Sequence, residues 1–234
     1  MQGLRGRLAM GHGTAVAGVI GAITNNGAGV ASVAPLSRIM PIRTGDATGF
    51  SYASAIVNGM TWAVDHGAKV LNISINSVAG VSSIKTAAQY VRSKGGVVVA
   101  AAGNCACFDS TPENPYMISV SATVETDALA SFSSRGNYVD IAAPGDHIWT
   151  TVRGGGYMMH YGTSFASPVV AGVVAVMMGA NPTLAPTTIE TLLLSNADDR
   201  GTAGRDTSYG YGRVNAARAV AAAAGVVAST PPAD

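Results

Sequence analysis

Two kinds of hydrophobic pattern alternate along most of the chain. Apolar side chains three or four residues apart predict helices over residues 52–66 and 82–94, and a glycine follows each of these segments. Short apolar runs predict strands at 37–44, 69–75, 97–102, 117–122 and 139–142, and further helices are predicted at 187–196 and 214–224. Continuous apolar strands that alternate with helices pair in parallel and are covered on both faces. The predicted fold class is therefore α/β, with a three-layer, mostly parallel β-sheet and helices on both faces.

The longest apolar run, residues 168–178, follows Gly162-Thr163-Ser164. It is small, uncharged and long enough for a buried helix, with Pro168 expected in the first turn. Ser164 would then lie where the helix dipole favours negative charge, which suits a nucleophilic oxygen. Taken alone, the same serine is more simply interpreted as an N-cap. We expect no membrane span, because Asn181-Pro182 interrupts the run.

Composition excludes several classes of protein. The chain has 234 residues, of which 48% are hydrophobic and 12% charged, so we expect one tightly packed domain and no long disordered segment. A net charge of +1 without any basic run gives no support to nucleic-acid binding. The first ten residues are too short and too interrupted for a signal peptide.

The two cysteines, Cys105 and Cys107, are separated by one residue. That spacing is too close for a zinc ribbon or a thioredoxin-type pair. Two free or partly buried thiols are favoured over a strained local disulfide. A bridge remains a second hypothesis, and it would stiffen the loop that follows Asn104.

Polar residues with catalytic chemistry fall at strand ends and helix starts. Gly11-His12-Gly13-Thr14 opens an apolar helical run over 15–22, residues 72–74 and 100–104 end two strands, and Ser164 opens the buried helix. In parallel sheets, reactive groups gather at the carboxyl ends of the strands. A serine can attack a carbonyl, a histidine can take its proton, and an asparagine amide can stabilise the oxyanion. In isolation, His12 could cap a helix and Asn104 could be a turn residue.

The motifs that carry this chemistry resemble those of the subtilisin-like serine proteases, the subtilases. They are His-Gly-Thr with Val-Ala-Gly, Val-Ala-Pro at 33–35, Ala-Ala-Gly-Asn, Ala-Pro-Gly at 143–145 and Gly-Thr-Ser-x-Ala-Ser-Pro. Their order and spacing match from Gly11 to about Ala219. The resemblance implies His12 as general base, Ser164 as nucleophile, and Asn104 with the Ser164 N–H as oxyanion-hole donors. The α/β-hydrolase alternative needs Gly-x-Ser-x-Gly, and Ala166 stands at its last position.

The resemblance also implies a substrate-binding strand at Ser74, Ile75 and Asn76, with further substrate contacts at Ala102 and Gly103. A peptide would add to this strand by backbone pairing. Asn76 stands where the family usually has glycine, which would alter the rim of the pocket for the residue before the cleaved bond.

One departure from the family concerns the catalytic Asp, which usually precedes the His by roughly thirty residues. Only eleven residues precede His12, and none is acidic. We therefore expect an N-terminally truncated, subtilisin-like catalytic domain over residues 1–226 without its first strand, and a flexible tail at 227–234. In subtilisin, the type member of the family, loss of this Asp alone lowers kcat by about 3 × 10⁴. The expected activity is an impaired endopeptidase; the alternatives are an esterase-like remnant acting on activated esters and a non-catalytic peptide-binding pseudoprotease.

Partners and cofactors follow from the same resemblance. Polypeptide substrates and secretion are implied, with neither nucleic acid nor membrane as a partner. No cofactor is expected; Asn25 and Asn26 resemble part of the family's calcium loop, but calcium binding there would be weak or none. Loss of a strand would expose a sheet edge, so self-association through that edge is a further expectation.

Overall fold

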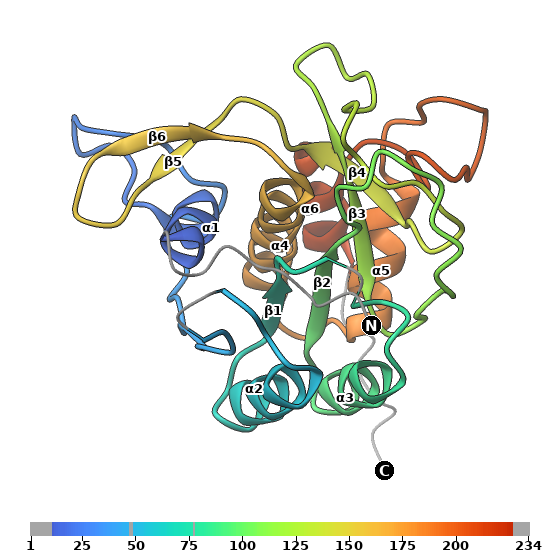
Figure 1. Cartoon of the computed structure of the whole chain (residues 1–234), viewed down its shortest axis with the longest axis horizontal. Coiled ribbons are helices and arrows are strands. Elements are labelled where there is room, and N and C mark those ends of the chain that lie inside the picture. Colours follow the sequence, from blue (N-terminus) through green and yellow to red (C-terminus); the bar gives the residue numbers. More distant parts are fainter. Residues whose placement is uncertain (1–10, 47–48, 77, 227–234) are drawn as a thin grey trace.

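Four parallel strands form the central sheet of the computed structural model, which describes residues 11–46, 49–76 and 78–226. The strands are β1 (Val70–Ile73), β2 (Val97–Ala101), β3 (Ile118–Thr123) and β4 (Ile141–Pro144), and they lie side by side in that order (Figure 1). The register aligns Val70 with Val97, Val99 with Ile118 and Val120 with Ile141. All three pairings are parallel, which confirms the α/β class that the alternating pattern predicts.

Helices cover both faces of the sheet (Figure 1). They are α2 (Ala53–Asp65) and α3 (Ser82–Ser93) on one face, and α4 (Thr163–Ala180), α5 (Pro186–Ser195) and α6 (Ala216–Gly225) on the other. Successive side chains of a strand point to opposite faces. Val98 accordingly packs with α2 and α3, whereas Val97 and Val99 pack with α4, α5 and α6. The two faces thus bury two separate hydrophobic clusters.

Helix α4 is the centre of the second cluster and lies against all four strands. Its 18 residues have a mean hydropathy of 1.7, so by length and composition it could cross a membrane, contrary to the sequence-based expectation. Two thirds of that stretch, 67%, is buried inside the protein. A helix that is apolar all round is what a core position requires.

A two-stranded antiparallel hairpin, which the hydrophobic pattern did not predict, lies over the first helix. It consists of β5 (Ile148–Thr151) and β6 (Tyr157–His160), and it covers α1 (His12–Gly21) (Figure 1). The hydroxyls of Thr150 and Thr151 donate to the Ala15 and Thr14 carbonyls at 2.7 and 3.0 Å. The three consecutive glycines of the connecting turn, residues 154–156, were the available sequence signal, since all adopt positive φ.

The strand predicted at 37–44 is wrong, because these residues form neither strand nor helix. A strand needs a neighbour to pair its backbone groups, and within the described residues only an isolated bridge, Gly45 with Ser51, lies nearby. Pro41 also removes one ladder donor. Ile42 instead packs its side chain against Gly59 of α2. The tail predicted at 227–234 lies outside the described residues.

Candidate active site

The amino end of α4 meets the carboxyl ends of β1 and β2, where Ser164 lies in the first helical turn. The helix begins at Thr163, and Gly162, with φ of 133°, is its N-cap. Ser164 is therefore inside the helix, which makes the N-cap interpretation wrong. Its side chain is largely buried, with the residue 8% exposed, and its hydroxyl donates to the Ser74 carbonyl at 3.4 Å.

Pro168 lies in the second turn of α4, and not in the first as expected. Proline has no N–H, so the carbonyl four residues earlier, that of Ser164, loses its helical partner. The Ser74 hydroxyl fills this position by donating to the Ser164 carbonyl at 2.8 Å. Asn72 in turn donates to the Ser74 hydroxyl at 2.9 Å and accepts from Ser167 at 2.7 Å. The end of β1 is thereby fastened to the turn that carries the candidate nucleophile.

Asn104 is held in one orientation by Thr163. Its side-chain oxygen accepts from the Thr163 N–H at 2.9 Å and from the Thr163 hydroxyl at 3.0 Å. The Thr163 hydroxyl is fully buried and also lies 3.1 Å from the Gly103 N–H, from which it accepts. Because the amide oxygen is occupied on the Thr163 side, the amide NH₂ group faces away from Thr163.

Two unpaired donors converge beside Gly162. Among the described residues, neither the Asn104 NH₂ nor the Ser164 N–H has a hydrogen-bond partner. A Cβ built on Gly162 would lie 3.4 Å from Asn104 Nδ2 and 3.7 Å from the Ser164 nitrogen. The absence of that Cβ leaves the space open. Donors that aim at one point next to a serine hydroxyl can stabilise an oxyanion.

His12 is the first residue of α1, and it is brought to the start of α4 by aromatic packing. Its ring lies 5.7 Å from the Phe165 ring in an edge-on arrangement, and Phe165 directly follows the candidate nucleophile. His160 also stacks on this residue, with its ring 4.9 Å from the Phe165 ring. Its Nε2 is buried and has no hydrogen-bond partner among the described residues. Phe165 is a contact that the sequence reasoning did not identify.

The candidate substrate strand faces the loop after β2. Ser74, Ile75 and Asn76 are half-buried, whereas Ala102 and Gly103 are buried. The Asn76 Cβ lies 4.0 Å from the position that a Cβ on Gly103 would take. The Ala102 carbonyl accepts from the Tyr138 hydroxyl at 2.8 Å. The structure therefore places Asn76 of the predicted substrate strand close to Gly103 of the loop after β2.

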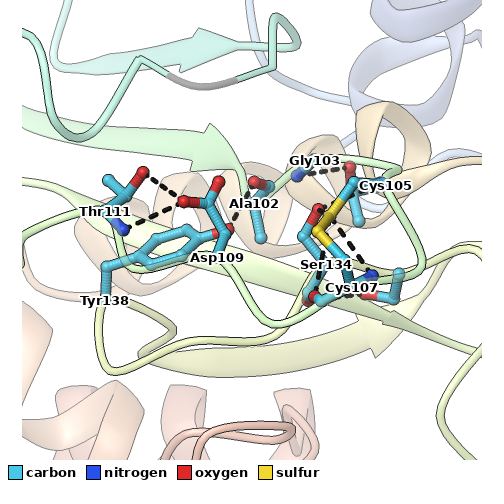
Figure 2. The surroundings of a disulfide bond; sticks show 10 residues. Ala102, Gly103, Cys105, Cys107, Asp109, Thr111, Ser134 and Tyr138 are labelled. Carbon is cyan, nitrogen blue, oxygen red and sulfur yellow. Dashed lines mark hydrogen bonds between the residues drawn. A yellow bond between two sulfur atoms is a disulfide. The ribbon is translucent and has the colours of Figure 1, made fainter.

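Cys105 and Cys107 form a disulfide, so the expectation of two free thiols is wrong. Figure 2 shows the bridge beside Gly103 and Ser134. A strained geometry had disfavoured the bridge, but the turn at Ala106 adopts a left-handed φ of 56° and brings the two Cα atoms to 5.1 Å. That separation lies within the range that a disulfide requires.

Asp65, Asp109 and Asp140 each have hydrogen-bond partners away from His12. Asp65 accepts from Tyr90, and Asp109 accepts from both the N–H and the hydroxyl of Thr111. Asp140 is buried and accepts from the Ser119 N–H at 2.8 Å, with Arg205 at 3.3 Å. Burial raises the pKa of Asp140 to about 7, although the Ser119 N–H and Arg205 each lower it.

The loop that resembles a calcium site offers neutral oxygens. It lines an open depression of about 260 Å³ formed by residues 24–31, and the Asn26 side-chain oxygen already accepts from the Ala28 N–H at 3.1 Å. No cluster of three or more His, Cys, Asp or Glu side chains lies within the part of the chain that the structure describes. Calcium prefers six to eight oxygens that include carboxylates, so these residues fit the ion poorly.

Comparison with known proteins agrees with the family resemblance of the sequence motifs. The sequence matches the Subtilase family over residues 5–212. Thermitase from Thermoactinomyces vulgaris is 39% identical over 214 residues, which cover 90% of this chain and 75% of that protein. Subtilisin E from Bacillus subtilis is 38% identical over 210 residues, 87% of this chain and 54% of that protein.

Solved structures agree with the sequence matches. A protease from Pseudoalteromonas arctica superimposes with a TM-score of 0.81 at 34% identity, covering 91% of this chain and 70% of that one. A lanthipeptide protease superimposes with a TM-score of 0.78 at 25% identity, covering 91% of this chain and 75% of that one.

Proposed function

Because the chain belongs to the subtilase family of serine endopeptidases, we propose that it hydrolyses peptide bonds through an acyl-enzyme on Ser164. The observation that carries the proposal is the convergence of two unpaired donors, Asn104 Nδ2 and the Ser164 N–H, beside Gly162. Hydrogen bonds fix the positions of both donors, since Thr163 orients the Asn104 side-chain amide and Ser74 binds the first turn of α4.

In the proposed first half-reaction, the Ser164 oxygen bonds to the substrate carbonyl carbon while its proton passes to the His12 imidazole. The carbonyl oxygen becomes negative and accepts from Asn104 and the Ser164 N–H. The C–N bond then breaks, and His12 returns the proton to the leaving amine. In the second half-reaction, water attacks the acyl-enzyme, His12 takes its proton, and Ser164 is released with the proton restored.

Substrates are proposed to be polypeptides that lie along Ser74, Ile75 and Asn76. The backbone of an extended peptide would pair with this strand, and the side chain before the cleaved bond would lie near Asn76 and Gly103. The net charge of +1 favours neither nucleic acid nor an acidic surface as partner. Export from the cell is proposed on the family resemblance alone.

We further propose that these 234 residues, assayed by themselves, cleave peptide bonds slowly. The sequence before His12 has no acidic side chain. A carboxylate on the base orients the imidazole and stabilises its charged form, and its loss in subtilisin corresponds to roughly 6 kcal/mol at about 1.4 kcal/mol per tenfold change in rate.

An active-site serine probe tests the proposal. A fluorophosphonate should label the protein at Ser164, and Ser164→Ala should abolish both labelling and hydrolysis. If Ser164 stays unlabelled and Ser164→Ala changes no rate, the enzyme proposal fails and a non-catalytic peptide-binding role takes its place.

The lack of an acidic side chain among residues 1–11 favours a second candidate, hydrolysis of activated esters. An activated ester has a leaving group that needs no protonation, whereas a peptide amine does. We therefore expect a larger rate enhancement on p-nitrophenyl acetate than on casein, each measured against the uncatalysed reaction. Equal enhancements on the two substrates would contradict the argument.

A further inference from the structure

The Cys105–Cys107 bridge is exposed and lies next to the candidate oxyanion donor. Cys105 directly follows Asn104, and Cys105, Ala106 and Cys107 are all exposed to solvent. The sequence contains no cysteine besides these two, so the bridge is the one target that this chain offers to a thiol reductant.

Ser134 links the bridge to the backbone on both sides of Asn104. Its hydroxyl accepts from the Cys105 N–H and donates to the Cys105 sulfur, each at 3.2 Å, and its N–H donates to the Gly103 carbonyl at 2.9 Å. Figure 2 shows Ser134 between Gly103 and the two sulfurs. Ser134 itself is buried. Ser134 therefore holds both the Cys105 sulfur and the backbone on either side of Asn104.

The bridge also holds a strained residue. Ala106 has a left-handed φ of 56°, which is unfavourable for a residue with a Cβ. The Ala106 N–H donates to the Phe132 carbonyl at 2.9 Å, and the Cys107 N–H donates to the Cys105 sulfur at 3.2 Å. Opening the bridge removes the covalent closure of this turn, and Ala106 can then relax to an ordinary conformation.

We infer that the Cys105–Cys107 disulfide positions Asn104 for the oxyanion, and that its reduction by a dithiol lowers the turnover of Ser164. In the reduction, one thiolate of the dithiol attacks a bridge sulfur to form a mixed disulfide. Its second thiolate then releases the cysteine, so that the protein gains two thiols and the dithiol becomes a disulfide. The inference rests on the proposed function, since Asn104 has this role only if Ser164 is acylated.

The experiment compares oxidised and dithiothreitol-reduced protein with p-nitrophenyl acetate, a substrate too small to pair with the strand at Ser74, Ile75 and Asn76. We expect reduction to lower kcat by about threefold to tenfold and to leave KM nearly unchanged. This is less than the factor of about 10²–10³ that removal of an oxyanion donor costs. Alkylation of both cysteines confirms the reduction, and Cys105→Ser/Cys107→Ser should behave as the reduced protein and not respond to dithiothreitol.

Ala106→Gly is the matched control for the strain. Glycine accepts positive φ without penalty, so the reduced variant should keep the turn and lose less of its kcat than the reduced wild type. The side-chain amide resonance of Asn104, assigned with Asn104→Ala, should shift on reduction in the wild type and shift less in Ala106→Gly.

The outcomes separate the inference from the proposed function. Equal kcat and an unchanged Asn104 resonance in the two redox states overturn the inference while Ser164 remains reactive. A shifted resonance together with an unreactive Ser164 overturns the proposed function and, with it, the catalytic part of the inference. A fall in thermal stability on reduction, with unchanged kcat in the protein that stays folded, also overturns the inference, because the bridge then affects stability alone.

Discussion

At the scale of single residues, Thr163 orients the side chain of Asn104, and this role can be tested separately from the chemistry at Ser164. Thr163→Val removes the hydroxyl that contacts both Asn104 and the Gly103 N–H. We expect kcat to fall about tenfold, against about 10²–10³ for Asn104→Ala, with KM little changed in both. Loss of the partner of a buried N–H should also lower the free energy of unfolding by about 1–3 kcal/mol.

A double-variant cycle tests whether Thr163 acts through Asn104. Residues that act through one group are not additive, so Asn104→Ala/Thr163→Val should be no slower than Asn104→Ala alone. Thr163→Ser keeps the hydroxyl and serves as control. Additive losses in kcat would show that Thr163 has a separate role.

We expect the free energy of unfolding to depend on pH through the carboxyl group of Asp140. Its pKa is raised from 3.8 to about 7 by burial, so between about pH 4 and pH 7 the folded state holds a proton that the unfolded state has lost. The unfolded state then binds fewer protons, and stability falls as the pH rises through this window. A shift of this size corresponds to roughly 4 kcal/mol at about 1.36 kcal/mol per pKa unit.

Urea unfolding across that pH range measures the effect. Asp140→Asn cannot titrate, so its free energy of unfolding should depend less on pH than that of the wild type. A wild-type stability that rises between pH 4 and pH 7, or equal slopes in the two proteins, would contradict the assignment to Asp140.

At the scale of elements, two glycines of α1 have opposite roles although they lie five residues apart. A Cβ on Gly18 would lie 2.2 Å from the Thr151 hydroxyl and 2.4 Å from the Thr150 hydroxyl, whereas a Cβ on Gly13 would meet no atom within 4 Å. We expect Gly18→Ala to push α1 from β5, to cost about 1–3 kcal/mol and to slow the labelling of Ser164, because α1 carries His12. Gly13→Ala, as control, should leave the melting temperature equal or slightly higher.

The link between β1 and α4 can be tested by restoring the missing helical donor. Because Pro168 has no N–H, the Ser164 carbonyl accepts its hydrogen bond from the Ser74 hydroxyl. Ser74→Ala removes this bond, and we expect the free energy of unfolding to fall by about 1 kcal/mol. Pro168→Ala in that background supplies a helical N–H and should recover most of the loss. In the presence of Ser74, the same change should recover little; equal effects in both backgrounds would contradict the link.

Sequence patterns predicted the strands of the central sheet and the helices that cover it, and failed where contact with a neighbouring segment determines the conformation. The strands at 69–75 and 97–102 are apolar enough to be identified alone, and the position of Asn104 followed from the second of them. The position of Ser164 followed from the apolar run of α4. Segment 37–44 also carries apolar side chains, but pairing with a neighbour determines whether such a segment is a strand. The hairpin of β5 and β6 and the ring contact of Phe165 both depend on contacts with α1. Local sequence patterns do not reveal contacts between distant segments.

At the scale of the whole molecule, the segment that failed to become a strand leaves an apolar surface. Leu36 is 98% exposed, Ile39 41%, Met40 38% and Ile42 36%. Within the described residues, β1 is also an edge of the central sheet, and an edge with unpaired backbone groups can pair with another chain. The two features together predict self-association that increases with protein concentration.

Sedimentation velocity over a range of concentrations measures this association. Leu36→Lys/Met40→Lys places two charges on the apolar surface, so the double variant should remain monomeric where the wild type associates, with its secondary structure unchanged. Phe108→Lys, which changes an exposed aromatic residue outside the segment, is the control and should associate as the wild type does. A wild type that is monomeric at every concentration would show that the exposed segment and the free edge do not bind a second copy. Association that Phe108→Lys abolishes and the double variant retains would place the contact at the loop that carries the disulfide, and not at the sheet edge.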